Sequence, residues 1–400
     1  MHLAYLHYLC DGASGLNHVR QFATAAQALG HELDVYAMNL APRDASGSAG
    51  SSAAWTLREG LKKRFGRYLH EPKELYWNIR YARRETKLLQ SKRPDVLLVR
   101  NHLLTASCVW VARRLELPLV IELNAPAAES RLYWDEYSHV PLVPEWLEAW
   151  KLRRADSVTV VSTALKNHVI DQYSLSESKL TVVPNGADVA TFHPDAAPDP
   201  EVSSQLADAT VVGFVGSFQK FHGSDLLGRM AQQLGSARTD VAFLFVGEGP
   251  EVHALRQQTK SLGGRIIFTG GVQHSRIPGL VACMDIGVMP QSNFYGSPLK
   301  VLEWMAAGKA VVAPRYGPLE EIMEDGVEGL LFPPEDHAAL IDCVTRLAER
   351  PDLARSLGQA AAARVRSSLT WEHNASRVLQ ACQQAHRGYR RVERSASLAE

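Results

Sequence analysis

Residues 241–247 read VAFLFVG, six apolar residues followed by a glycine. Runs of the same kind occur at 94–100 (PDVLLVR), 117–123 (LPLVIEL), 209–216 (ATVVGFVG) and 309–314 (KAVVAP). Strands buried on both faces have this composition, because helices cover both faces of a parallel sheet. Helix-length segments separate the runs. The pattern therefore predicts an α/β protein with doubly wound parallel sheets.

The strand pattern falls into two halves. The first ends near the turn Pro184-Asn185-Gly186, a Pro- and Asp-rich stretch follows at 193–200, and the pattern restarts at Ala209. We expect two Rossmann-like domains, over residues 1–186 and 187–370, that face a central cleft. A C-terminal helix over 371–390 and a tail over 391–400 complete the predicted organisation.

The composition excludes several classes of protein. Of the 400 residues 46% are hydrophobic, and 43 basic residues balance 43 acidic ones. A disordered chain is excluded, and a globally basic nucleic-acid-binding protein is disfavoured. No apolar segment could span a bilayer, and the N-terminus does not resemble a signal peptide. Five scattered cysteines fit a reducing compartment, so we expect a cytoplasmic protein.

Residues 58–93 concentrate positive charge. They hold twelve basic and four acidic residues, so the local balance is 12 − 4 = +8, and aromatic residues are interleaved. One interpretation is a pair of solvated helices with apolar undersides. The other is an amphipathic surface that contacts anionic lipid at the inner face of a membrane.

The segment FYGSPLKVLEWMAAG at 294–308 carries the strongest chemical signal. Ser297 is suited to an N-cap, Pro298 to the first helical position and Gly308 to a helix end, so we expect a helix from Pro298 to about Ala307. This helix begins after a predicted strand, where α/β folds place ligands. Its free N–H groups favour an anion.

Lys300 and Glu303 fit a nucleotide at that helix end. A lysine in the first turn opposes the helix dipole, and a bound phosphate would remove the conflict. Glu303 lies on the same face and could accept both hydroxyls of a ribose. Alternatively, the segment is an ordinary capped helix with a surface Lys–Glu pair.

Glycine-containing loops follow several predicted strands. In the loop 216–223, Gly216 and Gly223 permit close approach of a ligand, and Lys220 and His222 could stabilise a leaving phosphate. The loop 11–15 is a weak dinucleotide fingerprint. The turns at 246–250 and 268–272 lie at the same predicted sheet edge, and either could be plain turn chemistry. They contain Gly247, Glu248 and Val272.

Several catalytic motifs are absent from the sequence. It contains no D-x-D pair, no P-loop, no G-x-S-x-G and no H-E-x-x-H. We therefore expect neither a metal nor another cofactor.

In combination these segments resemble the family-4 glycosyltransferases of the GT-B fold. The resemblance is strongest from Arg153 to about Leu379, where KLTVVPNGADVATFHP, VGEGPE, IIFTGGV and SPLKVLEWMAAGKAVVA occur in the family's order. The pairing of GSFQKFHG with YGSPLKVLE is similar to one branch of the family. The resemblance implies a retaining transfer of a hexosyl unit from a nucleoside diphosphate sugar, UDP favoured over GDP. The acceptor would be a hydroxyl of a saccharide or lipid-linked molecule, in cell-surface polysaccharide or glycoconjugate synthesis.

The resemblance also assigns roles to residues. The first domain would bind the acceptor, the second would bind the nucleotide sugar, and the last helix would cross back to the first. His222, Lys300, Glu303 and Glu122 are the catalytic candidates. The remaining donor-site candidates are Gly12, Gly15, Ser217, Lys220, Gly223, Gly247, Glu248, Val272, Tyr295, Gly296, Ser297, Pro298 and Leu299. The remaining acceptor-side candidates are Arg100, His102, Asn124 and Glu129.

Two departures from the family pattern bear on the donor. The family often has a glutamate where this chain has Tyr295, and basic residues where it has Ser217 and His222. Two other functions stay open at this point. One is a sugar-nucleotide epimerase on the same fold, and the other is a silent sugar-nucleotide-binding assembly protein.

Overall fold

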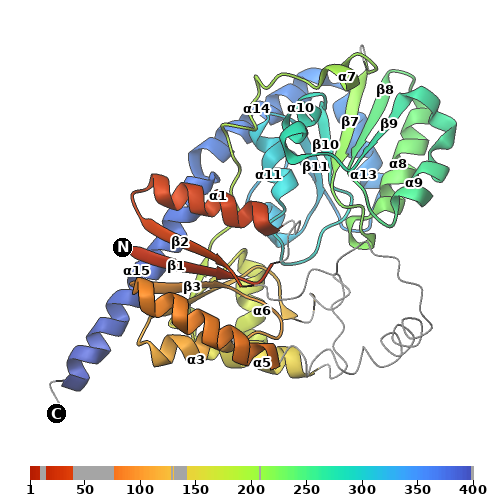
Figure 1. Cartoon of the computed structure of the whole chain (residues 1–400). Coiled ribbons are helices and arrows are strands. Elements are labelled where there is room, and N and C mark those ends of the chain that lie inside the picture. Colours follow the sequence, from red (N-terminus) through yellow and green to blue (C-terminus); the bar gives the residue numbers. More distant parts are fainter. Residues whose placement is uncertain (10–14, 39–75, 128, 130–141, 207–208, 398–400) are drawn as a thin grey trace, which may run out of the picture. The chain divides into compact units, whose positions relative to one another are not determined.

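The structure, a computed structural model, describes residues 1–9, 15–38, 76–127, 129, 142–206 and 209–397. The chain divides into two compact units. Unit 1 holds Met1–Val161, Leu165–Val183 and Ala375–Glu400, and unit 2 holds Ser162–Ala164 and Pro184–Asn374. Each unit contains a six-stranded parallel sheet flanked by helices, which confirms the prediction of two Rossmann-like domains (Figure 1).

The sheet of unit 1 has the strand order β2-β1-β3-β4-β5-β6. Its strands are β1 (His2–His7), β2 (Glu32–Ala37), β3 (Val96–Arg100), β4 (Leu119–Leu123), β5 (Ser157–Val160) and β6 (Leu180–Val182). Across the sheet, the connection from β1 to β2 runs in one direction, and the connections from β2 through β6 run in the opposite direction. Right-handed crossovers therefore place the first helix on one face and the later helices on the other.

The helices of unit 1 follow that rule (Figure 1). One face carries α1 (Gly15–Ala28), and the opposite face carries the helical residues 76–92, α3 (Ser107–Arg114), α5 (Leu142–Arg154) and α6 (Thr163–Tyr173). The last helix, α15 (Trp371–Ser397), belongs to unit 1 from Ala375 onward.

The sheet of unit 2 has the order β12-β11-β10-β7-β8-β9. Its strands are β7 (Thr210–Val215), β8 (Val241–Val246), β9 (Ile266–Gly270), β10 (Ile286–Val288), β11 (Ala310–Pro314) and β12 (Leu330–Phe332). Its main helices are α8 (Ser224–Ala237), α9 (Val252–Gln258), α10 (Ile277–Ala282), α11 (Leu299–Ala306), α13 (His337–Glu349) and α14 (Pro351–Ser368). Shorter helices are α7 (Pro200–Ser203) and α12 (Gly317–Glu320), with 3-10 turns such as η2 (Lys220–His222). This order switches direction between β7 and β10, where doubly wound folds bind ligands.

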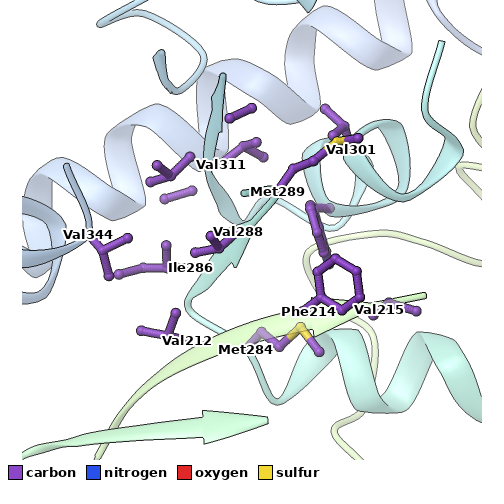
Figure 2. Close-up of a cluster of buried hydrophobic side chains, with 14 of the residues drawn as sticks. Val212, Phe214, Val215, Met284, Ile286, Val288, Met289, Val301, Val311 and Val344 are labelled. Carbon is purple, nitrogen blue, oxygen red and sulfur yellow. The ribbon is translucent and has the colours of Figure 1, made fainter. Parts of the chain in front are cut away.

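The core of unit 2 is built from the apolar runs that identified the fold. Val212, Phe214 and Ile286 are almost fully buried with Val301 of α11, and Figure 2 shows these side chains in one cluster. The cluster holds β7, β10 and α11 together. It therefore fixes the loops at their carboxyl ends.

The local expectations are confirmed with two exceptions. α8 begins at Ser224, and Gly308, with φ at +71°, follows α11. The helix predicted from Pro298 instead begins at Leu299, with Pro298 at the N-cap and no capping side chain. Strand β12 was not predicted, because its three residues are too short for a periodic signal.

Candidate active site

The loops after β7, β8 and β9 lie against one another at the carboxyl edge of the sheet of unit 2. A Cβ on Gly247 would lie 2.0 Å from the carbonyl oxygen of Gly216, so only glycine permits this approach. The Gly247 N–H donates to the carbonyl of Gly270 at 3.1 Å. The exposed Glu248 lies beside Gly270 and Gly271, and Val272 packs on the edge of the core. The donor-site candidates Gly247, Glu248 and Val272 are thus neighbours.

The first turn of α11 offers free donors at this edge. Ser297 does not cap the helix, because its hydroxyl accepts the N–H of Asn185 at 3.1 Å and its carbonyl accepts the Asn185 side-chain amide at 2.6 Å. Within the described residues, the N–H groups of Leu299 and Lys300 have no acceptor. Such a helix end favours an anion.

Lys300 is the cation of this site. Its Nζ lies 4.3 Å from the centre of the Phe214 ring, and a Cβ on Gly216 would be 2.7 Å from it. No hydrogen-bond acceptor reaches Nζ from the described part of the chain. Burial lowers the pKa of Lys300 to about 7, although the negative charge of Glu303 opposes this shift. The amine thus lacks the anion that would stabilise its charge.

His222 stands beside Lys300 at the end of the turn η2. Its ring is 4.4 Å from that of Phe221 and 5.8 Å from that of Phe214, centre to centre. Burial, and then the charge of Lys300, lower the pKa of His222 to about 3. The imidazole is therefore neutral at pH 7 and would act on a leaving phosphate as a hydrogen-bond donor rather than as a cation.

Glu303 is half-buried one turn along α11 from Lys300. Burial raises the pKa of Glu303 to about 7, Lys300 lowers it, and Asp188 raises it again. Hydrogen bonds from ligand hydroxyls would stabilise the ionised carboxylate.

The loop before α11 is fixed by its own hydrogen bonds. The Gly296 N–H donates to the side chain of Asn293 at 2.6 Å. Tyr295 is 3% exposed, and its carbonyl accepts the Ser162 hydroxyl at 2.7 Å. The phenol ring that replaces the usual glutamate is thus buried in unit 2.

The other donor-site candidates have simple placements. Ser217 and Lys220 are exposed, and Gly223 takes φ +70°, which favours glycine. A cavity of about 420 Å³ is lined by Lys220 and Gly223, among others. Gly15 begins α1 in unit 1, and Gly12 lies outside the described residues.

In unit 1 a buried polar cluster surrounds Glu122. Arg100 and Glu122 are register partners on β3 and β4, and Nη1 of Arg100 donates to Oε1 of Glu122 at 2.7 Å. Tyr5 donates to Oε2 at 2.5 Å, Asn124 donates to Oε1, and Nδ1 of His18 lies 3.5 Å from Oε1. Burial alone would raise the pKa of Glu122, but His18 and Arg100 outweigh it and hold the pKa below its usual value. Glu122 is therefore an ionised acceptor held by three hydrogen bonds.

A second buried network holds the loops that follow β3 and β4. The ammonium of Lys151 donates to the side chain of Asn101 at 2.7 Å and to the carbonyl of His102 at 2.6 Å. Glu148 accepts from Asn101 and from the N–H of Ala127. This network positions His102, which also contacts Thr105 at 3.0 Å. Glu129, half-buried, lies two residues beyond Ala127.

Sequence reasoning missed the residues that hold these clusters. They are Tyr5, His18, Phe214, Glu148 and Lys151. The available signal was the pair Glu148 and Lys151, which occurs at i, i+3 among apolar residues of a helix.

Comparison with known proteins matches both units. A family model described as "Glycosyltransferase Family 4" matches residues 16–191, and one described as "Glycosyl transferases group 1" matches residues 209–350. Both halves of the chain thus match glycosyltransferase models, which supports a glycosyltransferase. Glycogen synthase of Mycobacterium tuberculosis is 26% identical to this glycosyltransferase over 308 residues, which cover 76% of this chain and 72% of that protein.

Two further relatives show the range of the group. A GDP-mannose-dependent phosphatidylinositol monomannoside mannosyltransferase of Mycolicibacterium smegmatis is 28% identical over 273 residues, 63% of this chain and 70% of that one. The structure of Anabaena HepE in complex with UDP superposes with a TM-score of 0.69 at 18% identity, covering 96% of this glycosyltransferase and 100% of HepE. The two parallel sheets thus have the GT-B architecture.

The described residues contain neither a metal-binding cluster nor a membrane-spanning helix. No three His, Cys, Asp or Glu side chains there could jointly hold a metal ion. No described helix is both long and apolar enough to cross a bilayer.

Proposed function

We propose that this glycosyltransferase moves a hexosyl unit from a nucleoside diphosphate sugar to a hydroxyl of a saccharide or lipid-linked acceptor, with retention at the anomeric carbon. The observation that carries the proposal is the unpaired amine of Lys300 beside the uncapped first turn of α11. Both groups stabilise negative charge, which grows on the diphosphate as the glycosidic bond breaks. A product assay that follows sugar transfer tests it.

Each group of site residues would have a separate role in the transfer. Lys300, the first-turn N–H groups and neutral His222 would stabilise the departing diphosphate. Glu303 would accept the ribose hydroxyls. The Glu122 cluster and the loop of His102 would orient the acceptor, because the buried carboxylate of Glu122 already accepts hydrogen bonds from Tyr5, Arg100 and Asn124. The leaving phosphate would then help to deprotonate the acceptor hydroxyl.

The nucleotide is proposed to be UDP rather than GDP. Named relatives include one that is GDP-mannose-dependent and one bound to UDP. A thermal-shift series with UDP-, GDP- and ADP-sugars discriminates them, because binding raises apparent stability by mass action. Stabilisation by GDP-sugars alone would reverse this assignment.

We expect transfer to survive EDTA. Lys300 and the end of α11 can neutralise diphosphate charge without a divalent cation, and the sequence lacks a D-x-D pair. Initial rates should be unchanged within about twofold after EDTA treatment. Loss of activity that Mn²⁺ or Mg²⁺ restores would contradict metal independence.

Replacement of Glu303 by alanine should weaken donor binding at least tenfold. Hydrogen bonds to a charged group contribute about 1.5–3 kcal/mol each, and the ribose offers two hydroxyls. Titration calorimetry with UDP measures the change, and Glu324→Ala, at an exposed residue of unit 2, is the matched control. Unchanged UDP affinity in Glu303→Ala would remove the ribose role.

The family matches favour transfer over the epimerase and the silent binding protein. An epimerase would convert the sugar nucleotide without an acceptor, and a silent protein would bind UDP without turnover. Product analysis with and without acceptor separates all three.

We also propose that residues 58–93 contact the inner face of an anionic membrane. The structure describes residues 76–93 of this segment.

A further inference from the structure

One face of unit 1 combines exposed aromatic residues with exposed cations. It consists of the helical residues 76–92, α3 and α5, and we name it the three-helix face. These three segments lie in successive crossovers from β2 to β5, so they lie on the same side of the sheet (Figure 1). Two of the three elements lie wholly outside residues 58–93.

The three segments are locked to one another. The side-chain oxygen of Asn78 accepts the N–H groups of Ala106 and Ser107 at 2.6 and 3.0 Å, where α3 begins. The Trp110 ring of α3 meets the Trp150 ring of α5 edge to face, with 6.3 Å between centres. The face is therefore one surface rather than three independent helices.

The outward charge of the three-helix face is strongly positive. Its two fully buried carboxylates, Glu85 and Glu148, point inward, and the half-buried Glu145 is its only other acidic side chain. Lys92 pairs with Asp34 at 3.6 Å, and the other exposed basic residues of the face form no ion pair with a carboxylate in the described part of the chain. These are Arg80, Arg83, Arg84, Lys87, Arg113, Arg114, Arg153 and Arg154.

Large apolar side chains project from the same face. Tyr76 is 60% exposed, Ile79 50%, Trp110 49% and Trp146 63%, which is half of the exposed large apolar residues described in the chain. Crossover helices run antiparallel to the strands, so residues near their starts lie toward the carboxyl edge of the sheet. Tyr76, Ile79 and Trp146 thus lie toward the edge that carries the Glu122 cluster, whereas the arginines at the ends of α3 and α5 lie toward the opposite edge.

We infer that the three-helix face docks on an anionic lipid bilayer. Tryptophan and tyrosine favour the headgroup region, and clustered arginines are attracted to acidic headgroups. This orientation would bring the acceptor edge of unit 1 close to the lipid surface. The inference extends the membrane contact of the proposed function from residues 58–93 to α3 and α5. It rests on the proposed function only in that a lipid-linked acceptor would explain why the enzyme binds a membrane.

Vesicle flotation of the full chain tests this surface. Each basic residue near an anionic leaflet strengthens binding about fivefold, screened by salt. We expect binding to phosphatidylcholine vesicles that contain phosphatidylglycerol, little binding to pure phosphatidylcholine, and release at high salt. Arg113→Glu with Arg114→Glu, both on α3, should weaken the partition coefficient at least tenfold. Lys260→Glu with Arg350→Glu, exposed cations of unit 2, is the matched control and should bind as wild type does.

Brominated lipids report whether the aromatic residues enter the headgroup layer. We expect them to quench tryptophan emission, and Trp146→Ala to reduce that quenching while Val327→Ala, an exposed apolar control, leaves it unchanged. Thermal melts verify that each variant folds. Equal flotation with neutral and anionic vesicles, or unaltered binding by the α3 double variant, would overturn the inference. The inference would also be overturned if binding to soluble dextran sulfate were as tight as binding to vesicles and brominated lipids did not quench tryptophan emission. None of these results depends on transfer activity, so the proposed transfer is tested separately.

Discussion

Replacing Lys300 with methionine is expected to lower kcat by about 100- to 1000-fold, the usual effect of removing one preorganised donor to a developing anion. Methionine retains an unbranched apolar stem, which can remain on the Phe214 ring, so packing is largely conserved. The ammonium is lost at the position where the leaving diphosphate needs it. Steady-state kinetics with saturating donor measures the loss.

The pH dependence of donor binding gives an independent readout. With the pKa of free Lys300 near 7, the ammonium is present below pH 7 and is progressively lost above it. A bound diphosphate favours the charged form, so binding takes up a proton above pH 7 and UDP affinity falls as the pH rises. This decline should disappear in Lys300→Met.

The matched control is Lys260→Met, an exposed lysine of the same unit. It should change neither kcat nor the pH profile. If Lys300→Met kept more than about a third of wild-type kcat, diphosphate stabilisation would have to come from the helix end and His222, and the role given to Lys300 would be wrong.

The architecture could be predicted from the sequence because buried parallel strands have a distinctive composition. The runs at 94–100, 209–216 and 241–247 all form strands, and the glycines that end the last two runs allow their loops to approach one another. The lysine and glutamate of α11 could be placed on one helix face because helical periodicity is local. These predictions depend only on residues close in sequence.

The remaining features depend on contacts between distant residues. Ser297 has the chemistry of an N-cap, but Asn185, more than a hundred positions away, takes its hydroxyl. Glu122 looks like a candidate base until Tyr5 and Arg100, from two other strands, are placed on its oxygens. The exposed charge of residues 76–92 is likewise more positive than the sequence alone indicates, because Glu85 is buried while a net charge taken from the sequence includes it. Tertiary partners thus decide which polar residues remain free for chemistry.

Arg100→Ala is expected to be the most destabilising single change in unit 1. It leaves the carboxylate of Glu122, 8% exposed, without its cation. Removing one partner of a buried ion pair costs about 3–5 kcal/mol. For a domain of this size that corresponds to a fall in Tm on the order of 10 °C. Differential scanning calorimetry at pH 7 measures it.

The size of this deficit should depend on pH. In the wild-type protein the pKa of Glu122 is held low, so the stability that the pair provides is present at neutral pH and is lost as the pH falls through that pKa. In Arg100→Ala the cation is gone and burial raises the pKa of Glu122. The variant is therefore least stable, relative to wild type, above the raised pKa. The deficit shrinks as acid neutralises the carboxyl group.

A second substitution shows whether the buried charge is the cause. Adding Glu122→Gln to Arg100→Ala removes the unpaired carboxylate while Tyr5 and Asn124 keep a hydrogen-bonding partner, so the double variant should recover at least half of the lost stability. Arg100→Lys restores a cation but not the guanidinium geometry, and should recover only part of it. If the double variant were as unstable as the sum of the two single variants, the pair would contribute through packing rather than charge. Transfer activity of Arg100→Lys, measured below its Tm, then reports on the acceptor, because a folded variant with wild-type KM for the acceptor would leave Arg100 a structural role alone.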